Sequence, residues 1–78
     1  MTRSVFSPTY GRLRELLIRA RRTQGLTQAQ LATRVGRRQS FVSKYERGER
    51  RLDLVEVLEI ADALALDVCQ LIAELRRP

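Results

Sequence analysis

The sequence predicts an all-α fold, a compact domain of five helices, and three observations predict it. Apolar residues recur with helical spacing in five stretches, most of these stretches begin with a residue suited to cap a helix, and no stretch alternates as a strand does. The chain has 78 residues, the length of one small domain. We expect residues 7–78 to form this domain, and residues 1–6, which lack periodicity, to form a flexible arm.

The first helix is predicted to begin after Ser7, an N-cap residue followed by proline at the first helical position. Its apolar stripe, spaced i, i+3, i+7 and i+10, consists of Tyr10, Leu13, Leu17 and Ala20. Between the apolar positions lie several arginines, and we expect most of them to be solvated: Arg12, Arg14, Arg19 and Arg22.

Two short helical patterns joined at Gly36 form the centre of the chain. Thr27 can cap the first pattern, and Gln30 stands where a capping box requires it. Gly36 suits the left-handed conformation of a tight helix exit. The second pattern has an apolar side with Val42 and Tyr45, and its opposite side carries Gln39, Ser40, Ser43, Lys44 and Arg47. A short helix with an apolar back and such a polar front is typical of a helix that reads DNA bases.

Two further helices are predicted in the carboxyl-terminal half. Asp53 with Glu56, and Asp67 with Gln70, have the spacing of capping boxes. The expected inward stripes are Val57, Ile60, Ala61 and Leu64 in the first helix and Val68, Leu71, Ile72 and Leu75 in the second.

The composition favours a polyanionic partner and argues against catalysis. The formal net charge is +6 and the pI is near 11.0, although a merely solvated basic surface is the alternative. One cysteine and no histidine exclude a disulfide framework and a zinc site of the Cys/His type. Because the sequence also lacks a nucleophile elbow and a glycine-rich phosphate loop, we expect no enzyme activity, cofactor or metal. It shows neither a membrane span nor a signal peptide, so we expect a cytoplasmic, nucleoid-associated protein.

The central stretch also matches a known sequence pattern. The matching residues are Gly-Leu-Thr-Gln-Ala-Gln-Leu-Ala at 25–32, Gln-Ser-Phe-Val-Ser-Lys-Tyr-Glu-Arg-Gly-Glu-Arg at 39–50, and Ile-Ala-Asp-Ala-Leu at 60–64. They resemble the Cro/CI-like (XRE) phage-repressor family, over roughly residues 10–75. The resemblance implies a lambda-repressor-like domain whose second and third helices form a helix-turn-helix. Two departures are Arg38, where the family often has a capping serine, and Ala65, where it usually has glycine.

The resemblance implies roles for several polar residues. It implies that Arg21 pairs with Glu46, the alternative being two separate surface charges. It also implies that Gln28 holds a phosphate and orients Gln39. From their chemistry, we expect base reading by Gln39, Ser40, Ser43 and Lys44. We expect phosphate binding by Gln28, Arg37, Arg38, Arg47, Arg50 and Arg51, and either Arg50 or Arg51 could enter a narrow minor groove.

Phe41 has two interpretations. Its ring lies beside the predicted reading face, where it could contact a thymine methyl group. Alternatively, it packs on the second helix.

The last two helices carry more apolar residues than so small a domain can bury, which suggests a protein–protein face rather than scattered surface groups. The predicted dimer interface consists of Leu54, Leu58, Cys69, Ile72 and Leu75, helped by Val5 and Phe6 of the arm. We therefore expect a sequence-specific transcriptional regulator, a repressor that binds an inverted-repeat operator in double-stranded DNA as a homodimer. The alternative is an antitoxin-like interaction module whose main contact is a partner protein.

Overall fold

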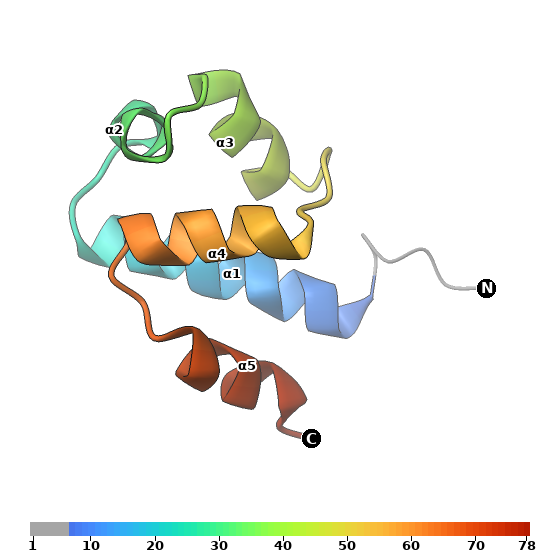
Figure 1. Ribbon diagram of the computed structural model, residues 1–78. Helices are drawn as coiled ribbons and strands as arrows, with labels where there is room; N and C mark the ends of the chain where they lie inside the picture. The colour runs from blue at the N-terminus through green and yellow to red at the C-terminus, as the bar shows by residue number, and fades with distance from the viewer. Residues whose placement is uncertain (1–6) are drawn as a thin grey trace.

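The computed structural model describes residues 7–78, and the expected arm with Val5 and Phe6 lies outside the described residues. This part of the chain contains five α-helices and no strand: α1 (Pro8–Thr23), α2 (Gln28–Val35), α3 (Gln39–Glu46), α4 (Leu54–Ala63) and α5 (Val68–Arg76). Helices α1 and α4 occupy the middle of the molecule, with α2 and α3 on one side and α5 on the other (Figure 1). No helix among the described residues combines the length and the apolarity needed to cross a bilayer. The prediction of a five-helix, all-α fold is confirmed.

Local capping signals set where most of the helices begin. The Ser7 hydroxyl accepts a hydrogen bond from the Tyr10 amide at 3.0 Å, and Pro8 follows as the first residue of α1. Capping boxes begin α2 and α4, at Thr27 and Asp53 respectively. Asp67 caps α5 by accepting from the amides of two residues of its first turn. Helix α3 is different, because its N-cap residue, Arg38, makes no side-chain capping bond.

Four helices end at a residue with positive φ, which turns the chain sharply toward the next helix. These residues are Gly25, Gly36, Gly48 and Ala65. At the end of α4, the Leu66 amide bonds the Ala61 carbonyl at 2.8 Å and the Ala65 amide bonds the Asp62 carbonyl at 3.1 Å. This is the Schellman pattern, and it places Ala65 at φ 54°. The turn after α4 therefore forms with Ala65, where the family usually has glycine, in a left-handed conformation.

The core is built from the apolar stripes of all five helices and one loop residue. Its largest fully buried side chains are Tyr45, Leu17, Leu31, Ile60, Leu64 and Val42. Tyr10 joins the loop after α3 to α1, since its hydroxyl accepts from the Leu52 amide at 2.9 Å. These contacts pack α2 and α3 against α1 and α4, and one side of α3 is left facing outward.

Two arginines of α1 bond helix ends far away in the sequence. Arg12 donates to the Leu75 carbonyl at 2.8 Å, near the end of α5. Arg14 donates to the Glu46 carbonyl at 2.6 Å, at the end of α3. The carbonyls of a last helical turn lack intrahelical partners, and a cation there also complements the helix dipole. Most of the α1 arginines are exposed, as expected, and Arg12 bonds the end of α5 from the surface, whereas Arg14 is half-buried and caps the end of α3.

Candidate nucleic-acid interface

Helix α3 buries one side and presents the other to solvent. Its buried residues are Phe41, Val42, Tyr45 and Glu46. Of the four residues predicted to read bases, Gln39, Ser40 and Lys44 are exposed, and Ser43 is half-buried. The structure therefore brings all four to the outward side of one short helix, at the edge of the molecule (Figure 1). A glutamine amide offers a donor and an acceptor and a lysine offers three donors, so this row has the chemistry to bond base edges.

The last turn of α3 continues into a small polar cluster. The Arg47 guanidinium donates to the Glu49 carboxylate at 2.9 and 3.2 Å and also to the Ser43 hydroxyl. The bond to Glu49 raises the pKa of Arg47, and the same bond lowers the pKa of Glu49. Both residues are exposed, so an approaching phosphate would compete with Glu49 for Arg47.

A buried ion pair anchors the carboxyl end of α3 to α1. Arg21 Nε lies 2.7 Å from Glu46 Oε2, and Arg21 Nη2 lies 3.0 Å from Glu46 Oε1. The two residues are 9% and 7% exposed, so they are not separate surface charges. Hydrogen bonding to Glu46 raises the pKa of Arg21 against the opposing effect of burial. The Gln28 amide donates to Glu46 Oε1 at 2.8 Å, which ties the first residue of α2 to the same carboxylate.

The family resemblance implies that Gln28 orients Gln39, but the structure shows Gln28 bonding a different residue. Its side chain bonds Glu46, and among the described residues no hydrogen bond joins it to Gln39. Gln28 remains half-buried at the amino end of α2. The structure makes it part of the α1–α2–α3 junction.

Phe41 packs inside the domain. Its ring is 9% exposed, belongs to the core and meets Tyr45 edge to face at 5.6 Å between ring centroids. The guanidinium carbons of Arg37 and Arg50 lie 4.6 and 4.9 Å from the ring centroid. The ring is buried in the core and covered by these neighbours, so in this structure it is not open to contact a thymine methyl group.

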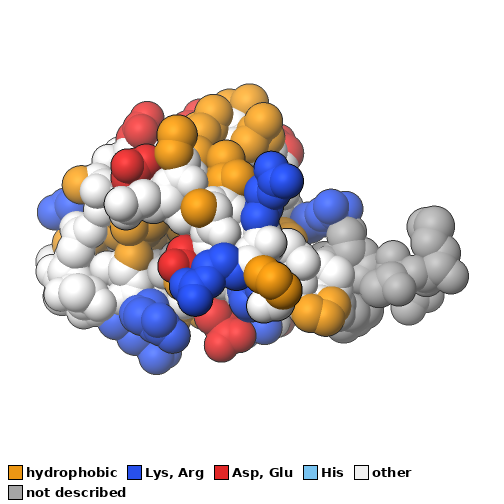
Figure 2. Space-filling model, turned by 90° about the horizontal axis from the view of Figure 1, so that it is seen from below, with side chains coloured by type: hydrophobic (Ala, Val, Ile, Leu, Met, Phe, Trp, Pro, Cys, Tyr) orange, Lys and Arg blue, Asp and Glu red, His pale blue; other side chains and the backbone are white. Residues whose placement is uncertain are grey.

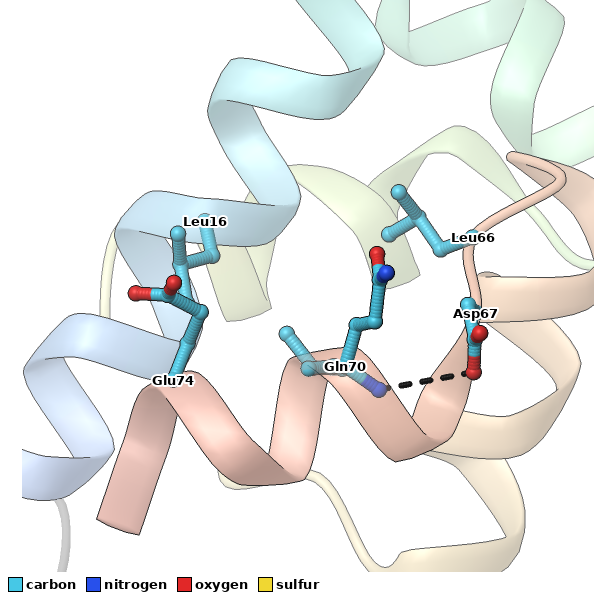
Figure 3. A pocket seen from close by; sticks show the side chains of 6 residues that line it. Leu16, Leu66, Asp67, Gln70 and Glu74 are labelled. Atoms are coloured by element: carbon cyan, nitrogen blue, oxygen red, sulfur yellow. Dashed lines mark hydrogen bonds between the residues drawn. The ribbon is translucent and has the colours of Figure 1, made fainter. Parts of the chain in front are cut away.

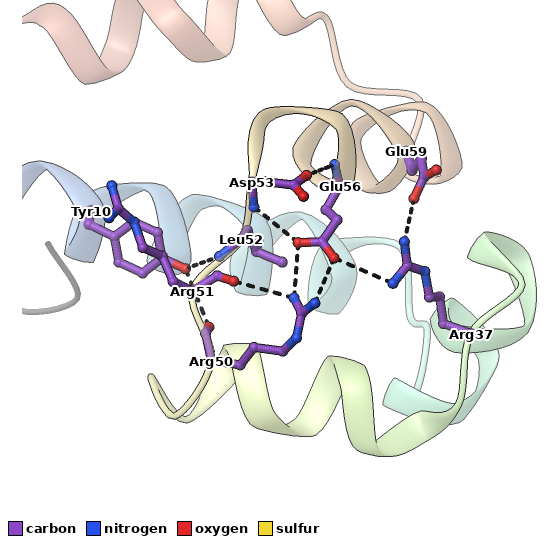
Figure 4. A network of polar contacts seen from close by, with 8 residues as sticks. All are labelled: Tyr10, Arg37, Arg50, Arg51, Leu52, Asp53, Glu56 and Glu59. Atoms are coloured by element: carbon purple, nitrogen blue, oxygen red, sulfur yellow. Dashed lines mark hydrogen bonds and ion pairs between the residues drawn. The ribbon is translucent and has the colours of Figure 1, made fainter.

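The same two arginines, Arg37 and Arg50, both bond the carboxylate of Glu56 in α4 (Figure 4). Arg50 donates to both oxygens of Glu56, at 2.9 and 2.7 Å, and Arg37 approaches Glu56 Oε2 at 3.4 Å. The Arg50 hydrogen bonds lower the pKa of Glu56 to about 2, with a further contribution from the Asp53 amide. The sequence predicts only a capping role for Glu56. No local pattern joins positions 37, 50 and 56, so its second role had no signal in the sequence.

Other basic residues around α3 have no acidic partner among the described residues. These are Arg38, Lys44 and Arg51, all of which are exposed. Arg38 stands immediately before α3, and Arg51 lies in the loop after it. Cations that are unpaired and exposed on both sides of a polar helix are suited to contact the two DNA strands that border a groove.

Comparison with known proteins agrees with this geometry. A family model described as Helix-turn-helix matches residues 17–71. The chain belongs to the XRE-type helix-turn-helix family. It is 37% identical over 54 residues to an uncharacterised HTH-type transcriptional regulator, y4dJ, of Sinorhizobium fredii, covering 69% of this chain and 70% of the relative. An XRE-family like protein from Pseudomonas syringae pv. tomato has a solved structure that is 45% identical, with a TM-score of 0.82 over 86% of this chain and 82% of that one. Membership of this family makes the protein a DNA-binding transcriptional regulator.

This helix-turn-helix protein also has apolar groups on its surface. Four large ones are exposed on α4 and α5: Leu54 at 69%, Val55 at 62%, Leu58 at 39% and Ile72 at 46%. Cys69 is exposed as well, whereas Leu75 is half-buried. Seen from the side of α5, hydrophobic side chains gather on one part of the surface between charged groups (Figure 2).

A small pocket lies between α1 and α5 of this regulator, on the side of the molecule away from α3 (Figure 3). It is lined by Leu16, Leu66, Asp67, Gln70, Leu71 and Glu74. Among residues 7–78, no group of three or more metal-ligating side chains is brought together. The polar residues of α3 and its flanking turns therefore remain the candidate functional site.

Proposed function

We propose that this helix-turn-helix regulator recognises a specific sequence of double-stranded DNA by inserting α3 into the major groove. The observation that carries the proposal is the exposed row of polar side chains on a helix whose other side is locked into the core. The major groove admits an α-helix and gives each base pair a distinct pattern of donors and acceptors. A rigidly anchored helix can match such a pattern at a fixed position and tilt.

Each residue of the row has a proposed role. Gln39 bonds adenine N6 and N7, and Lys44 bonds guanine O6 and N7. Ser40 and Ser43 are short, so they let the helix approach the base edges closely. The exposed cations Arg38 and Arg51 bind phosphates, and Arg47 does so when a phosphate replaces Glu49. Gln28, at the amino end of α2, supports a phosphate with the backbone amides of that helix end.

The reading role is tested by removing the two long side chains of the row. A preferred site is first selected from a random pool of duplex DNA. We expect Gln39→Ala and Lys44→Ala each to weaken binding to that site by about 1 to 3 kcal/mol and to relax the preference at one or two base positions. Gln70→Ala is the matched control, because Gln70 is exposed on α5, away from α3. Equal losses on selected and random DNA would reject base reading.

We further propose that the protein is a repressor and acts as a homodimer on an inverted repeat. One domain reads few base pairs, whereas a genome offers on the order of 10⁶ to 10⁹ competing sites. A two-fold dimer doubles the site and supplies the missing discrimination. Support comes from the exposed apolar groups of α4 and α5, which would be covered by a second copy. Because its proposed target is genomic DNA, we place the protein in the cytoplasm with the nucleoid.

The same apolar surface also supports a second candidate function, an antitoxin-like module that binds a different protein. The two candidates differ in what covers Leu54 and Ile72. A chain that self-associates in isolation supports the dimeric regulator. A chain that stays monomeric, and forms a complex of defined mass only with the product of a neighbouring gene, supports the interaction module.

A further inference from the structure

The two turns that flank α3 are tied to the same side chain of α4. Arg37 lies in the turn before α3, and Arg50 lies in the loop after it. Arg50 donates to Glu56 at 2.9 and 2.7 Å, and Arg37 donates to Glu56 at 3.4 Å. Glu56 is itself held in place, because its Oε1 accepts from the Asp53 amide at 3.0 Å and the residue is only 6% exposed. A single buried carboxylate therefore connects both ends of α3 to the start of α4.

The arginines are also fixed by an aromatic ring of α3 itself. The guanidinium groups of Arg37 and Arg50 both lie within 5 Å of the Phe41 centroid, at 4.6 and 4.9 Å. A guanidinium that stacks on a ring and bonds a carboxylate has little freedom to move toward another anion. Figure 4 shows both guanidinium groups converging on Glu56, with Glu59 bonding Arg37 on its other side.

These contacts engage both terminal nitrogens of each arginine, which a phosphate would also need. Both terminal nitrogens of Arg50 bond Glu56, and those of Arg37 bond Glu56 and Glu59, the latter at 3.2 Å. A DNA phosphate would have to compete with these carboxylates for either arginine. Arg38 and Arg51, one residue further along in each turn, have no acidic partner among the described residues. Each end of α3 thus has one occupied and one available cation.

We propose that Glu56 is a positioning residue for DNA recognition, which withholds Arg37 and Arg50 from the DNA backbone and fixes both ends of α3. The inference rests on the proposed function. Phosphate contacts supply essentially all of the affinity for non-specific DNA. Withholding cations beside the reading helix lowers the phosphate contribution to the binding of any sequence, whereas fixing both ends of α3 favours the contacts to bases, which form only at the specific site. Glu56 therefore raises the ratio of specific to non-specific binding without touching DNA.

The test compares Glu56→Gln with Glu59→Gln in the full chain. Both variants remove one negative charge from α4 and one partner of Arg37, but only Glu56 also holds Arg50. Binding to a selected duplex and to a random duplex is measured across a salt series. Glu56→Gln removes the only carboxylate that Arg50 bonds, whereas Arg37 keeps Glu59. The salt slope on random DNA should therefore steepen by about 1, and the specificity ratio should fall by on the order of tenfold. Glu59→Gln should leave both quantities close to those of the parent chain.

The outcomes separate this inference from the proposed function. A parent chain that does not distinguish the selected duplex from random DNA overturns both. A parent chain that discriminates, with Glu56→Gln and Glu59→Gln behaving alike, overturns the inference alone.

If Glu56→Gln does not fold, the salt slopes of Arg50→Gln and Arg38→Gln are compared instead. Arg50→Gln should leave the salt slope of the parent unchanged, while Arg38→Gln should reduce it by about 0.9, the value of one lost phosphate contact. An equal reduction in the two variants would show that Arg50 binds phosphate, and it would overturn the role of Glu56.

Discussion

Arg21 of α1 and Glu46 of α3 form a forked ion pair, with 2.7 Å between Nε and Oε2 and 3.0 Å between Nη2 and Oε1. The same carboxylate accepts from Gln28 at 2.8 Å, and Arg21 also donates to the Leu26 carbonyl at 2.8 Å. One buried cluster thus joins α1, both helices of the helix-turn-helix and the loop between α1 and α2. It fixes the carboxyl end of α3 just as the Glu56 cluster fixes its two flanking turns.

We predict that Glu46→Ala destabilises the domain by about 3 to 5 kcal/mol, because Arg21 is left as a buried charge without a partner. Thermal and urea unfolding measure the loss. Glu49→Ala is the matched control, since Glu49 pairs with Arg47 at the surface and its loss should cost less than about 1 kcal/mol. Similar melting shifts for the two variants would contradict a buried, stabilising pair.

A substitution at Ala65 should have the opposite effect and stabilise the domain. Its φ of 54° is a conformation that glycine adopts freely and alanine does not. We predict that Ala65→Gly raises the free energy of unfolding by about 1 kcal/mol, after allowing for the greater flexibility of glycine in the unfolded chain. For a domain of this size, the melting temperature should rise by about 4 to 8 °C. Ala73→Gly, in the interior of α5, is the control and should lower it.

Two tyrosines with contrasting hydroxyl groups provide a third prediction. The Tyr45 hydroxyl is buried without a hydrogen-bond partner among the described residues, and burial raises the pKa of its phenol above the ordinary value of 10.0. The Tyr10 hydroxyl accepts from the Leu52 amide at 2.9 Å. Tyr45→Phe should therefore stabilise the protein by about 1 kcal/mol, while Tyr10→Phe should destabilise it by about 1 to 3 kcal/mol. Equal losses in equilibrium unfolding would mean that the Tyr45 hydroxyl is satisfied.

The helices could be predicted because their signals are local. Thr27 with Gln30, and Asp53 with Glu56, lie three residues apart, and each pair caps its helix as the spacing indicates. The outward side of α3 follows equally from periodicity, since Val42 and Tyr45 must face the core. The Arg21–Glu46 pair lies 25 residues apart, and only the family resemblance indicated it.

The partners of the other arginines could not be predicted in this way. Arg14 reaches a carbonyl 32 residues away, and Arg50 and Arg37 meet at Glu56 only in the folded domain. From sequence alone, each of these arginines resembles any other cation in a basic protein. Which cations pair with a carboxylate is therefore decided by tertiary structure, and the sequence alone does not separate Arg37 and Arg50 from Arg38 and Arg51.

Glu56 also predicts a dependence of stability on pH. Its folded-state pKa of about 2 lies below the ordinary value of 4.5, chiefly because of the Arg50 hydrogen bonds. A depressed carboxyl pKa stabilises the fold above pH 4.5, and this contribution is lost as the pH falls from 4.5 toward 2. Melting temperatures of the parent chain should fall more steeply across this window than those of Glu56→Gln. If the melting temperatures of the two proteins fall in parallel as the pH is lowered, Glu56 does not contribute to the acid sensitivity of the fold.

The last prediction concerns the proposed dimer. Ile72 is 46% exposed on α5, and a second copy packed on α4 and α5 would bury it. Replacing it with glutamate places a charge in an apolar contact, so Ile72→Glu should give folded monomers of 9.0 kDa. Gln70→Glu adds the same charge to α5 on the side that lines the α1–α5 pocket, and it should leave the dimer intact.

DNA binding gives an independent measure of the same contact. The recognition helices of a dimer must lie about 34 Å apart to enter successive major grooves on one face of the duplex. Ile72→Glu should therefore bind a single half-site as the parent does, but lose the extra affinity for two half-sites spaced by one turn of the double helix. Light scattering at tens of micromolar protein measures the oligomeric state, and titrations with one or two half-sites measure the gain in affinity. A parent chain that is monomeric and gains nothing from the second half-site would reject the dimer.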